Sequence, residues 1–203
     1  MSRGGRRDRI ERLSAKRSGV AATSSQDYLH LAHLLFAHSK AYAANCVGGN
    51  CSRYTWAGLP MLLAALQALV VECEFILHPA PSGAPVDINT PDFISRYGIT
   101  GDLLEDFRDL IELRNEIVHP AHATTGTKDN WPDYLIRIKG LGVLESTGED
   151  HDFVLLTQIA SHRLFSWAVQ VDRALYEKVI FSHPDRAPLI GGYLRSFDPP
   201  WFQ

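Results

Sequence analysis

Four stretches of the chain repeat apolar residues at the spacing of an α-helix, and each predicts a long helix. The first covers residues 26–45, where Tyr28, Leu31, Leu35 and Tyr42 mark one face. A Thr-Ser-Ser cluster directly before it supplies hydroxyl side chains suited to capping a helix N-terminus. We therefore expect the ordered part of the chain to begin with this helix.

The second predicted helix begins near Pro60, because proline is well placed in the first turn of a helix. From there to Leu77 the segment is apolar nearly all round, as expected of a helix buried at the centre of a protein. A proline-rich loop follows at residues 78–85, and residues 91–96 predict a short helix.

The third long helix is amphipathic and ends just before a proline. Its apolar stripe is formed by Leu103, Leu104, Phe107, Leu110, Ile111, Ile117 and Val118. Arg114 projects from this stripe, since it lies seven residues after Phe107 and four before Val118. An arginine in an apolar stripe either has a buried partner or lines a cleft or an interface.

The fourth helix is predicted from about Asp152 to Phe181. Its stripe consists of Phe153, Leu156, Ala160, Leu164, Trp167, Val171 and Leu175. Residues 120–151 look irregular, although residues 134–139 and 142–145 could pair as a small β-hairpin.

These elements predict an all-α fold, an antiparallel four-to-five-helix bundle with a loop or small β-hairpin inserted before the last long helix. The chain divides into a basic leader at residues 1–22, expected to be disordered, a helical domain at residues 23–183 and a tail at residues 184–203. The tail is rich in proline and aromatic residues, and its Trp201 and Phe202 are expected to dock on the body or on a partner.

Composition fits one soluble domain with a sizeable core, since 45% of the 203 residues are apolar and 21% are charged. The arginine-rich N-terminus has no apolar stretch behind it, so no secretory signal is expected. No membrane helix is expected either, because the most apolar segment, residues 61–77, carries Gln67, Glu72 and Glu74. Three cysteines do not suggest a disulfide framework, and a cytoplasmic location is the default expectation.

Charge is unevenly spread along the chain. Residues 1–22 hold seven basic and two acidic residues, which leaves 13 basic and 21 acidic residues for the remainder. A body this acidic is a poor non-specific binder of polyanions, and this argues against a promiscuous nuclease. The basic leader could supply the missing attraction to a nucleic acid.

The third helix closes on the sequence R-N-E-I-V-H-P, which contains Arg114, Asn115 and His119. An arginine can stabilise negative charge on a phosphate, and a histidine can move a proton near neutral pH. Together they suffice for metal-free cleavage of RNA. On a straight helix Arg114 and His119 lie roughly 140° apart, whereas Asn115 and His119 share a face. The proline after His119 biases its backbone away from the helical region and can re-aim the ring.

A structural interpretation of the same residues stays open. Most pairs of this kind are a cation at a helix end and a histidine satisfied within the fold. A buried ion pair from Arg114 to Glu72 or Glu74 of the preceding long helix would explain the arginine without any chemistry.

No metal or cofactor is expected. Three histidines lie on the first helix, but His38 is about 140° from His33, so the three do not share a metal. A zinc site from Cys46, Cys51, His119 and His122 is disfavoured by the loose cysteine spacing. The chain has no phosphate-cradling glycine loop, nucleophile elbow or H-E-x-x-H motif, which removes support for the common ATPases, serine hydrolases and zinc proteases.

The order of helices and the position of the Arg-His motif resemble the HEPN superfamily. Its pattern is R-x(4–6)-H on the penultimate long helix, commonly with Asn, Asp or His directly after the arginine. Arg114, Asn115 and His119 match this pattern, and the resemblance covers roughly residues 23–181. It implies a HEPN-like helical bundle.

The resemblance also implies an activity. Active HEPN proteins are metal-independent endoribonucleases, often toxins or defence and stress effectors, and they typically form homodimers in which two Arg-His pairs converge on one cleft. His119 would move a proton at the ribose 2′-OH or the leaving 5′-oxygen, Arg114 would stabilise the phosphorane and Asn115 would orient the phosphate or the histidine. The products would carry 2′,3′-cyclic phosphate and 5′-OH ends.

The chain departs from the HEPN toxin pattern at one position, and two other functions remain open. Toxin members that pair with a nucleotidyltransferase antitoxin carry a tyrosine two residues after the histidine, and Ala121 stands there in this chain. Other branches of the superfamily are non-catalytic modules that bind nucleotides or proteins, which the acidic body would suit. A helical regulatory subunit that docks through its C-terminal tail is a further reading. Expected partners are RNA, a second copy of the chain, and an antitoxin or regulatory protein, with no membrane.

Overall fold

The computed structural model describes residues 24–45, 52–78, 83–118, 131–144 and 161–184. These residues form α-helices and a single π-helical turn, and no strand occurs among them. The elements are α2 (Ser25–Asn45), α3 (Ser52–Val71), the π-turn η1 (Glu72–Ile76), α4 (Pro91–Arg96), α5 (Asp102–Val118), α6 (Asp133–Gly140) and α8 (His162–Phe181). The all-α helical bundle predicted from the sequence is confirmed.

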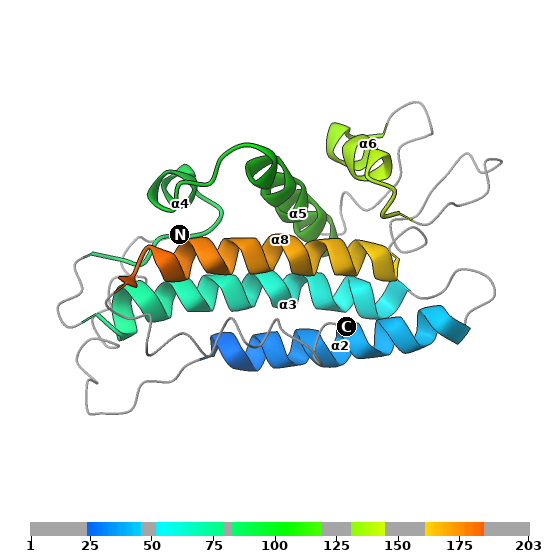
Figure 1. Cartoon of the computed structure of the whole chain (residues 1–203), viewed down its shortest axis with the longest axis horizontal. Helices are drawn as coiled ribbons and strands as arrows, with labels where there is room; N and C mark the ends of the chain where they lie inside the picture. The colour runs from blue at the N-terminus through cyan, green and yellow to red at the C-terminus, as the bar shows by residue number, and fades with distance from the viewer. Residues whose placement is uncertain (1–23, 46–51, 79–82, 119–130, 145–160, 185–203) are drawn as a thin grey trace, which may run out of the picture.

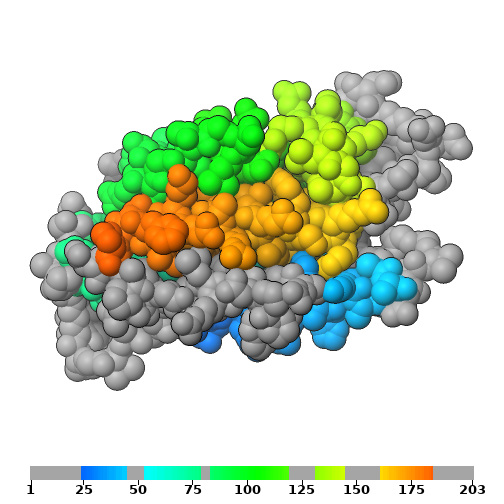
Figure 2. Space-filling model, in the orientation of Figure 1, coloured from blue at the N-terminus to red at the C-terminus, as the bar shows by residue number. Residues whose placement is uncertain are grey.

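The three longest helices, α2, α3 and α8, pack together, and the shorter helices cover one side of them. The helices α3 and α8 lie side by side, α2 packs on one side of this pair, and α4, α5 and α6 lie on the other (Figure 1). At the surface, α8 lies between the shorter helices α4, α5 and α6 on one side and α2 on the other (Figure 2). Helix α2 is antiparallel to α3, whereas α8 runs in the same direction as α3 because the intervening segment crosses back over the pair.

Helix α3 begins two turns before the position that the sequence predicted. It starts at Ser52 and contains Pro60 in its interior, where proline removes the backbone hydrogen bond to the carbonyl of Trp56. The first two turns are retained because Thr55 and Leu59 are fully buried against the neighbouring helices. Tertiary packing thus outweighs the local preference of proline for a helix start.

Gly58 lets α3 and α8 approach closely. A Cβ atom at this position would lie only 2.0 Å from Cζ of Phe165 on α8. The Phe165 ring is fully buried and also meets Phe36 of α2 edge to face, with the ring centroids 5.2 Å apart. One glycine therefore makes room for the aromatic side chain that joins the three long helices.

The central helix is long and apolar enough to span a membrane by length and composition alone, contrary to the expectation from the sequence. The stretch is Arg53–Ile76, with a mean hydropathy of 1.8. Half of its most apolar window is buried within the protein, where α2 and α8 cover it. A core helix of this kind satisfies the same length and composition criteria as a membrane span.

The apolar stripe that the sequence predicted for α2 is not the face of the helix that enters the core. Leu29, Ala32 and Phe36 are the residues that enter the core. Tyr28 and Leu31 of the predicted stripe are exposed instead. The helix therefore has two apolar faces, and the residues that the structure describes cover only one of them.

The small β-hairpin that the sequence allowed before the last helix is wrong, because residues 133–140 form α6. Leu135 and Ile138, three residues apart, are both buried, which is helical rather than strand spacing. Between them Arg137 reaches back to α5, where Nε donates to Asp109 Oδ2 at 2.5 Å and Nη2 donates to Asp106. Gly142, with a φ of 70°, then ends the turn after the helix.

The last long helix also begins later than predicted. Ser161 is its N-cap, with an extended backbone and a side-chain oxygen that accepts from Leu164 N at 3.1 Å. Helix α8 therefore starts at His162, not near Asp152. The expected leader at residues 1–22, nearly all of the expected tail at residues 184–203 and residues 145–160 lie outside the described part of the chain.

A carboxyl group is buried in the core. Asp172 of α8 is fully buried, and neither of its oxygens has a hydrogen-bond partner in the described part of the chain. Burial raises the pKa of this carboxyl well above its usual value. Its position seven residues after Phe165 places it on the same face of α8, which is the face directed at α3.

Candidate functional site

Arg114 lies near the end of α5, and its side chain is half-buried. Its Nη2 donates a hydrogen bond to Oδ1 of Asn89, which belongs to the loop before α4. Asn89 lies 25 positions before Arg114 in the chain, and no local sequence pattern connects the two. The structure therefore gives the arginine a neutral amide as its partner.

A tight turn holds the Asn89 side chain in place. Both the backbone N and Nδ2 of Asn89 donate to Oδ1 of Asp87, at 2.9 and 2.7 Å. Thr90 closes the turn, since its Oγ1 donates to the Asp87 carbonyl at 2.6 Å. With Nδ2 donated to Asp87, the Asn89 amide can only present its oxygen to Arg114.

The loop that carries this turn is anchored to the central helix by that helix's own polar residues. Gln67 donates to the Val86 carbonyl at 3.0 Å and accepts from Ile88 N at 2.9 Å. Glu74 of η1 accepts from Val86 N at 2.9 Å. The polar side chains on the otherwise apolar helix therefore fix the backbone on both sides of the Asp87 turn.

Part of the Arg114 guanidinium remains available. Among the described residues Nη1 makes no hydrogen bond, and it is not one of the buried atoms that lack a partner, so it is accessible to solvent. Nε is buried and has no hydrogen-bond partner within the described ranges. A fixed, partly desolvated guanidinium with open donors suits the binding of a phosphate oxygen.

Arg114 is half-buried without a carboxylate partner, whereas the other described arginines that lack an ion pair, Arg53, Arg108 and Arg163, are exposed. Arg96 contacts Glu74 at 2.9 Å, Arg137 bridges the carboxylates on α5, and Arg173 pairs with Glu177 at 3.4 Å. No carboxylate among the described residues forms an ion pair with Arg114. Its charge is therefore not neutralised by the part of the fold that the structure describes.

The two carboxylates considered as structural partners of Arg114 have other partners. Glu72 is buried and accepts from both N and Oγ of Ser25, at 2.9 and 2.6 Å, at the N-terminus of α2. Glu74 accepts from Arg96 and Tyr97. Burial alone would raise the pKa of Glu74, but these hydrogen bonds and the Val86 amide lower it below its usual value.

The remaining residues of the sequence motif are placed only in part. Asn115 lies on α5 directly after Arg114 and is half-buried. His119 lies outside the described residues, as do Cys46, Cys51 and His122 of the disfavoured zinc site. No cluster of three potential metal ligands occurs in the described ranges.

A serine-histidine contact elsewhere in the bundle does not form a nucleophilic site. Ser39 Oγ lies 3.2 Å from Nδ1 of His162 and 3.2 Å from Oγ1 of Thr55, which in turn donates to the Ser161 carbonyl. Burial, with a smaller contribution from Lys40, lowers the pKa of His162 below its usual value. Because Ser39 and Thr55 are fully buried, this cluster fastens α2 and α3 to the start of α8 and has no access for a substrate.

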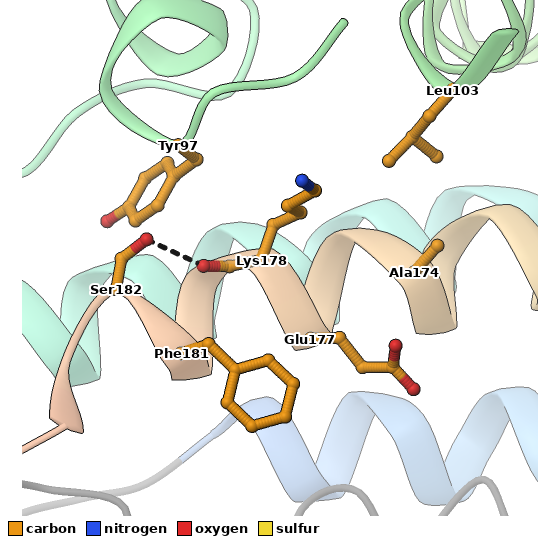
Figure 3. A pocket seen from close by; sticks show the side chains of 7 residues that line it. All are labelled: Tyr97, Leu103, Ala174, Glu177, Lys178, Phe181 and Ser182. Carbon is orange, nitrogen blue, oxygen red and sulfur yellow. Dashed lines mark hydrogen bonds between the residues drawn. The ribbon is translucent and has the colours of Figure 1, made fainter. Parts of the chain in front are cut away.

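A surface pocket of about 400 Å³ lies on α8, away from the expected motif. Its lining residues are Tyr97, Leu103, Ala174, Glu177, Lys178, Phe181 and Ser182. The Lys178 side chain extends towards the gap between Tyr97 and Leu103, whereas the Phe181 ring points away from Tyr97 (Figure 3). Neither Arg114 nor Asn115 lines this pocket, so it is not the site that the sequence predicted.

Comparison of the chain with protein-family models, with curated proteins and with solved structures gives no match. The interpretation of the site therefore depends on its own geometry. Sequence reasoning found Arg114 and missed its partner Asn89. The D-x-N sequence of residues 87–89 predicts a tight turn, but it gives no indication that this turn meets the end of α5.

Proposed function

We propose that this protein is a metal-independent endoribonuclease of the HEPN type, which acts on RNA through Arg114 and His119. The observation that supports the proposal is the half-buried Arg114 guanidinium, which is held by a neutral amide, carries no carboxylate partner in the described residues and keeps Nη1 open. An uncompensated cation in this setting favours a bound phosphate.

In the proposed reaction the ribose 2′-oxygen attacks the adjacent phosphorus, and the bond from phosphorus to the 5′-oxygen breaks. His119 accepts the 2′ proton or donates one to the leaving oxygen, while Arg114 stabilises the charge on the phosphorane. Asn115 orients the phosphate or the histidine. The reaction needs no metal or cofactor, and DNA is not a substrate because it has no 2′-OH.

The proposal includes a cytoplasmic role as a toxin or as a defence or stress effector. The basic residues 1–22 would attract RNA to an otherwise acidic protein. A homodimer is part of this proposal, with an antitoxin or regulatory protein as a further partner. The same open guanidinium also supports a second candidate, a non-catalytic module that binds the phosphate of a nucleotide.

The first test is cleavage of a labelled structured RNA and of a tRNA pool in the presence of EDTA. We expect wild-type protein to generate 2′,3′-cyclic phosphate and 5′-OH ends, and His119→Ala to abolish them while the protein stays folded by circular dichroism. Loss of the general acid-base group should lower the rate by roughly a hundredfold or more. Cleavage that persists in the variant would contradict the assignment of His119. If neither folded protein cleaves RNA, the result would favour the nucleotide-binding module.

A second test separates an anion-binding role of Arg114 from a merely structural one. Asn89→Asp keeps an oxygen that accepts from Arg114 and neutralises its charge. It also replaces the Nδ2 hydrogen bond to Asp87 with a repulsion between two carboxylates, so the melting temperature of the variant is measured beside its binding. We expect this variant to bind a non-cleavable 2′-O-methyl RNA roughly tenfold more weakly, which corresponds to about 1.4 kcal/mol. Binding is measured by fluorescence anisotropy.

The matched control for this test is Gln170→Glu, which adds the same charge at an exposed position of α8. It should leave the affinity for the oligonucleotide unchanged. Unaltered binding by Asn89→Asp, with the melting temperature retained, would identify the Asn89 contact as a structural link between the loop and α5.

A further inference from the structure

The surface pocket on α8 is bordered by a side chain that the fold holds firmly. Its volume of about 400 Å³ lies in the range of small-molecule sites. Tyr97, the residue directly after α4, borders it, and the Tyr97 hydroxyl donates to Glu74 Oε1 at 2.6 Å. Arg96 holds the same carboxylate at 2.9 Å. This border of the pocket is therefore in place before a ligand arrives.

The turn between α4 and α5 fixes the next border of the pocket. Gly98 and Gly101 have φ angles of 59° and 62°, which glycine adopts without strain. Between them Ile99 is 1% exposed, and its N donates to the Ile94 carbonyl at 3.0 Å. This turn sets the start of α5, and with it Leu103, beside α8. A pocket whose borders are already ordered costs little conformational entropy to fill.

Lys178 is the cation among the described residues that line the pocket. It forms no ion pair with any residue that the structure describes. Its neighbours one helical turn away carry no charge; they are Ala174, Leu175, Phe181 and Ser182. The positive charge of Lys178 is therefore available to a ligand.

The acidic residue in the lining does not neutralise this charge. Glu177 pairs instead with Arg173, at 3.4 Å. Its carboxylate points along α8 and away from the ammonium group of Lys178, which extends towards the gap between Tyr97 and Leu103 (Figure 3). A lysine near a helix C-terminus is favoured by the helix dipole wherever its side chain points in solvent, but this side chain reaches across the pocket.

The surface around Lys178 defines what a ligand must look like. Four of the seven lining residues are apolar or aromatic: Tyr97, Leu103, Ala174 and Phe181. A phosphate dianion requires several donors, whereas this pocket offers one ammonium group. The carbonyl end of α8 lies close by and opposes any further negative charge. A single carboxylate on an apolar body fits both the charge and the lining.

We propose that this pocket binds a small monocarboxylate with an apolar body, whose carboxylate pairs with Lys178 Nζ while the body packs on Leu103 and Ala174. Neither Arg114 nor Asn115 lines the pocket, so the site is separate from the one proposed for RNA. The proposal does not depend on the ribonuclease activity, and its test uses no RNA.

The first experiment is an NMR titration of the ¹⁵N-labelled full-length protein with 2-naphthylacetate. We expect amide shifts around Leu103, Ala174 and Lys178 and a dissociation constant on the order of 1 mM or below, as is usual for a ligand of this size. The uncharged analogue 2-(2-naphthyl)ethanol has a similar shape and should bind roughly fivefold more weakly. Absence of shifts at the pocket, or equal affinity for the acid and the alcohol, would overturn the proposal.

The second experiment assigns the charge to Lys178. Lys178→Gln should weaken binding of the acid roughly fivefold and leave binding of the alcohol unchanged, because only the acid uses the ammonium group. The matched control is Arg163→Gln, which removes an exposed cation from the other end of the same helix and should alter neither affinity. Equal effects of the two substitutions would show a general electrostatic attraction and contradict the site.

A third variant tests the apolar part of the pocket. Ala174→Leu adds three carbon atoms within the lining and retains a good helix former, so the helix should persist by circular dichroism. We expect the acid and the alcohol both to bind roughly tenfold or more weakly, because the added side chain occupies their space. Undiminished binding of both compounds to this folded variant would place them elsewhere on the protein.

Discussion

Gly58→Ala should strongly destabilise the protein, although alanine is the better helix former. The added Cβ would meet Cζ, Cε1 and Cε2 of Phe165 at 2.0, 2.5 and 2.9 Å, and the ring is fully buried. Because Phe165 also packs on Phe36, the ring has no open space in which to move, and α3 and α8 must separate. We expect a loss of about 3 kcal/mol or more in the free energy of unfolding, measured by urea denaturation.

A second substitution in the opposing side chain tests the cause of this loss. Phe165→Leu alone should destabilise the core, but combined with Gly58→Ala it should be less harmful than the sum of the two single effects. Gly140→Ala is the matched control, because nothing lies within 4 Å of a Cβ at that helical position. It should leave the stability unchanged or raise it slightly. Additive effects of the first two substitutions would contradict the steric explanation.

Asp172→Leu should have a large effect of the opposite sign and stabilise the protein at pH 8. The carboxyl is fully buried and has no hydrogen-bond partner among the described residues, so its ionised form is strongly disfavoured in the fold. We expect a gain of about 1–3 kcal/mol in the free energy of unfolding. Asp172→Asn, which has the shape of the protonated acid, should also stabilise at this pH and controls for the larger volume of leucine.

The pH dependence follows from the direction of the pKa shift. The pKa of Asp172 is raised in the folded state, so the folded protein binds this proton more tightly than the unfolded chain does. Its contribution to stability is complete below the unfolded pKa of about 4 and is lost as the pH rises towards the folded pKa. The advantage of both variants should therefore shrink between pH 8 and pH 4.

Glu177→Gln serves as a control for the loss of a carboxylate on the same helix. Its side chain is 41% exposed and lies 3.4 Å from Arg173, an ion pair of the kind that contributes at most a few tenths of a kcal/mol. It should change the free energy of unfolding little at either pH. Destabilisation by both Asp172 variants at pH 8 would show that the carboxylate has a favourable interaction in the fold.

The helical class of this fold was predictable because the apolar periodicity is strong, but the limits of individual helices were not. The sequence around Pro60 contains a good signal for a helix start, and the structure overrides it by packing Thr55 and Leu59. Residues 134–139 contain β-branched residues that also suit a strand, and the contact of Arg137 with α5 selects the helix. Both outcomes depend on residues distant in the sequence.

The face of a helix that enters the core was equally hard to predict where two faces are apolar. The stripe through Tyr28 and Leu31 has the clearer pattern, yet Leu29 and Phe36 are the buried residues. A hydrophobic pattern shows that a face avoids water, but it does not distinguish the protein's own core from an interface with another molecule.

Of the candidate site, the sequence predicted Arg114 but not the residue that binds it. An arginine within an apolar stripe is unusual, and this feature directed attention to Arg114. The identity of its partner depends on how Gln67 and Glu74 hold a loop against the central helix, so that Asn89 meets the end of α5. Tertiary arrangements of this kind are set by the whole fold and leave no local trace in the sequence.

The strongly apolar central helix also affects how the protein is made. The segment Arg53–Ile76 leaves the ribosome early, after α2, but α8 is complete only when Phe181 has been synthesised. At common rates of translation this interval is on the order of ten seconds. During that time the part of the covering that α8 provides is missing, and the nascent chain exposes an apolar surface that chaperones and the membrane-insertion machinery recognise. Rapid pairing of α2 with α3, which are adjacent in sequence, protects the growing chain until the last helix arrives.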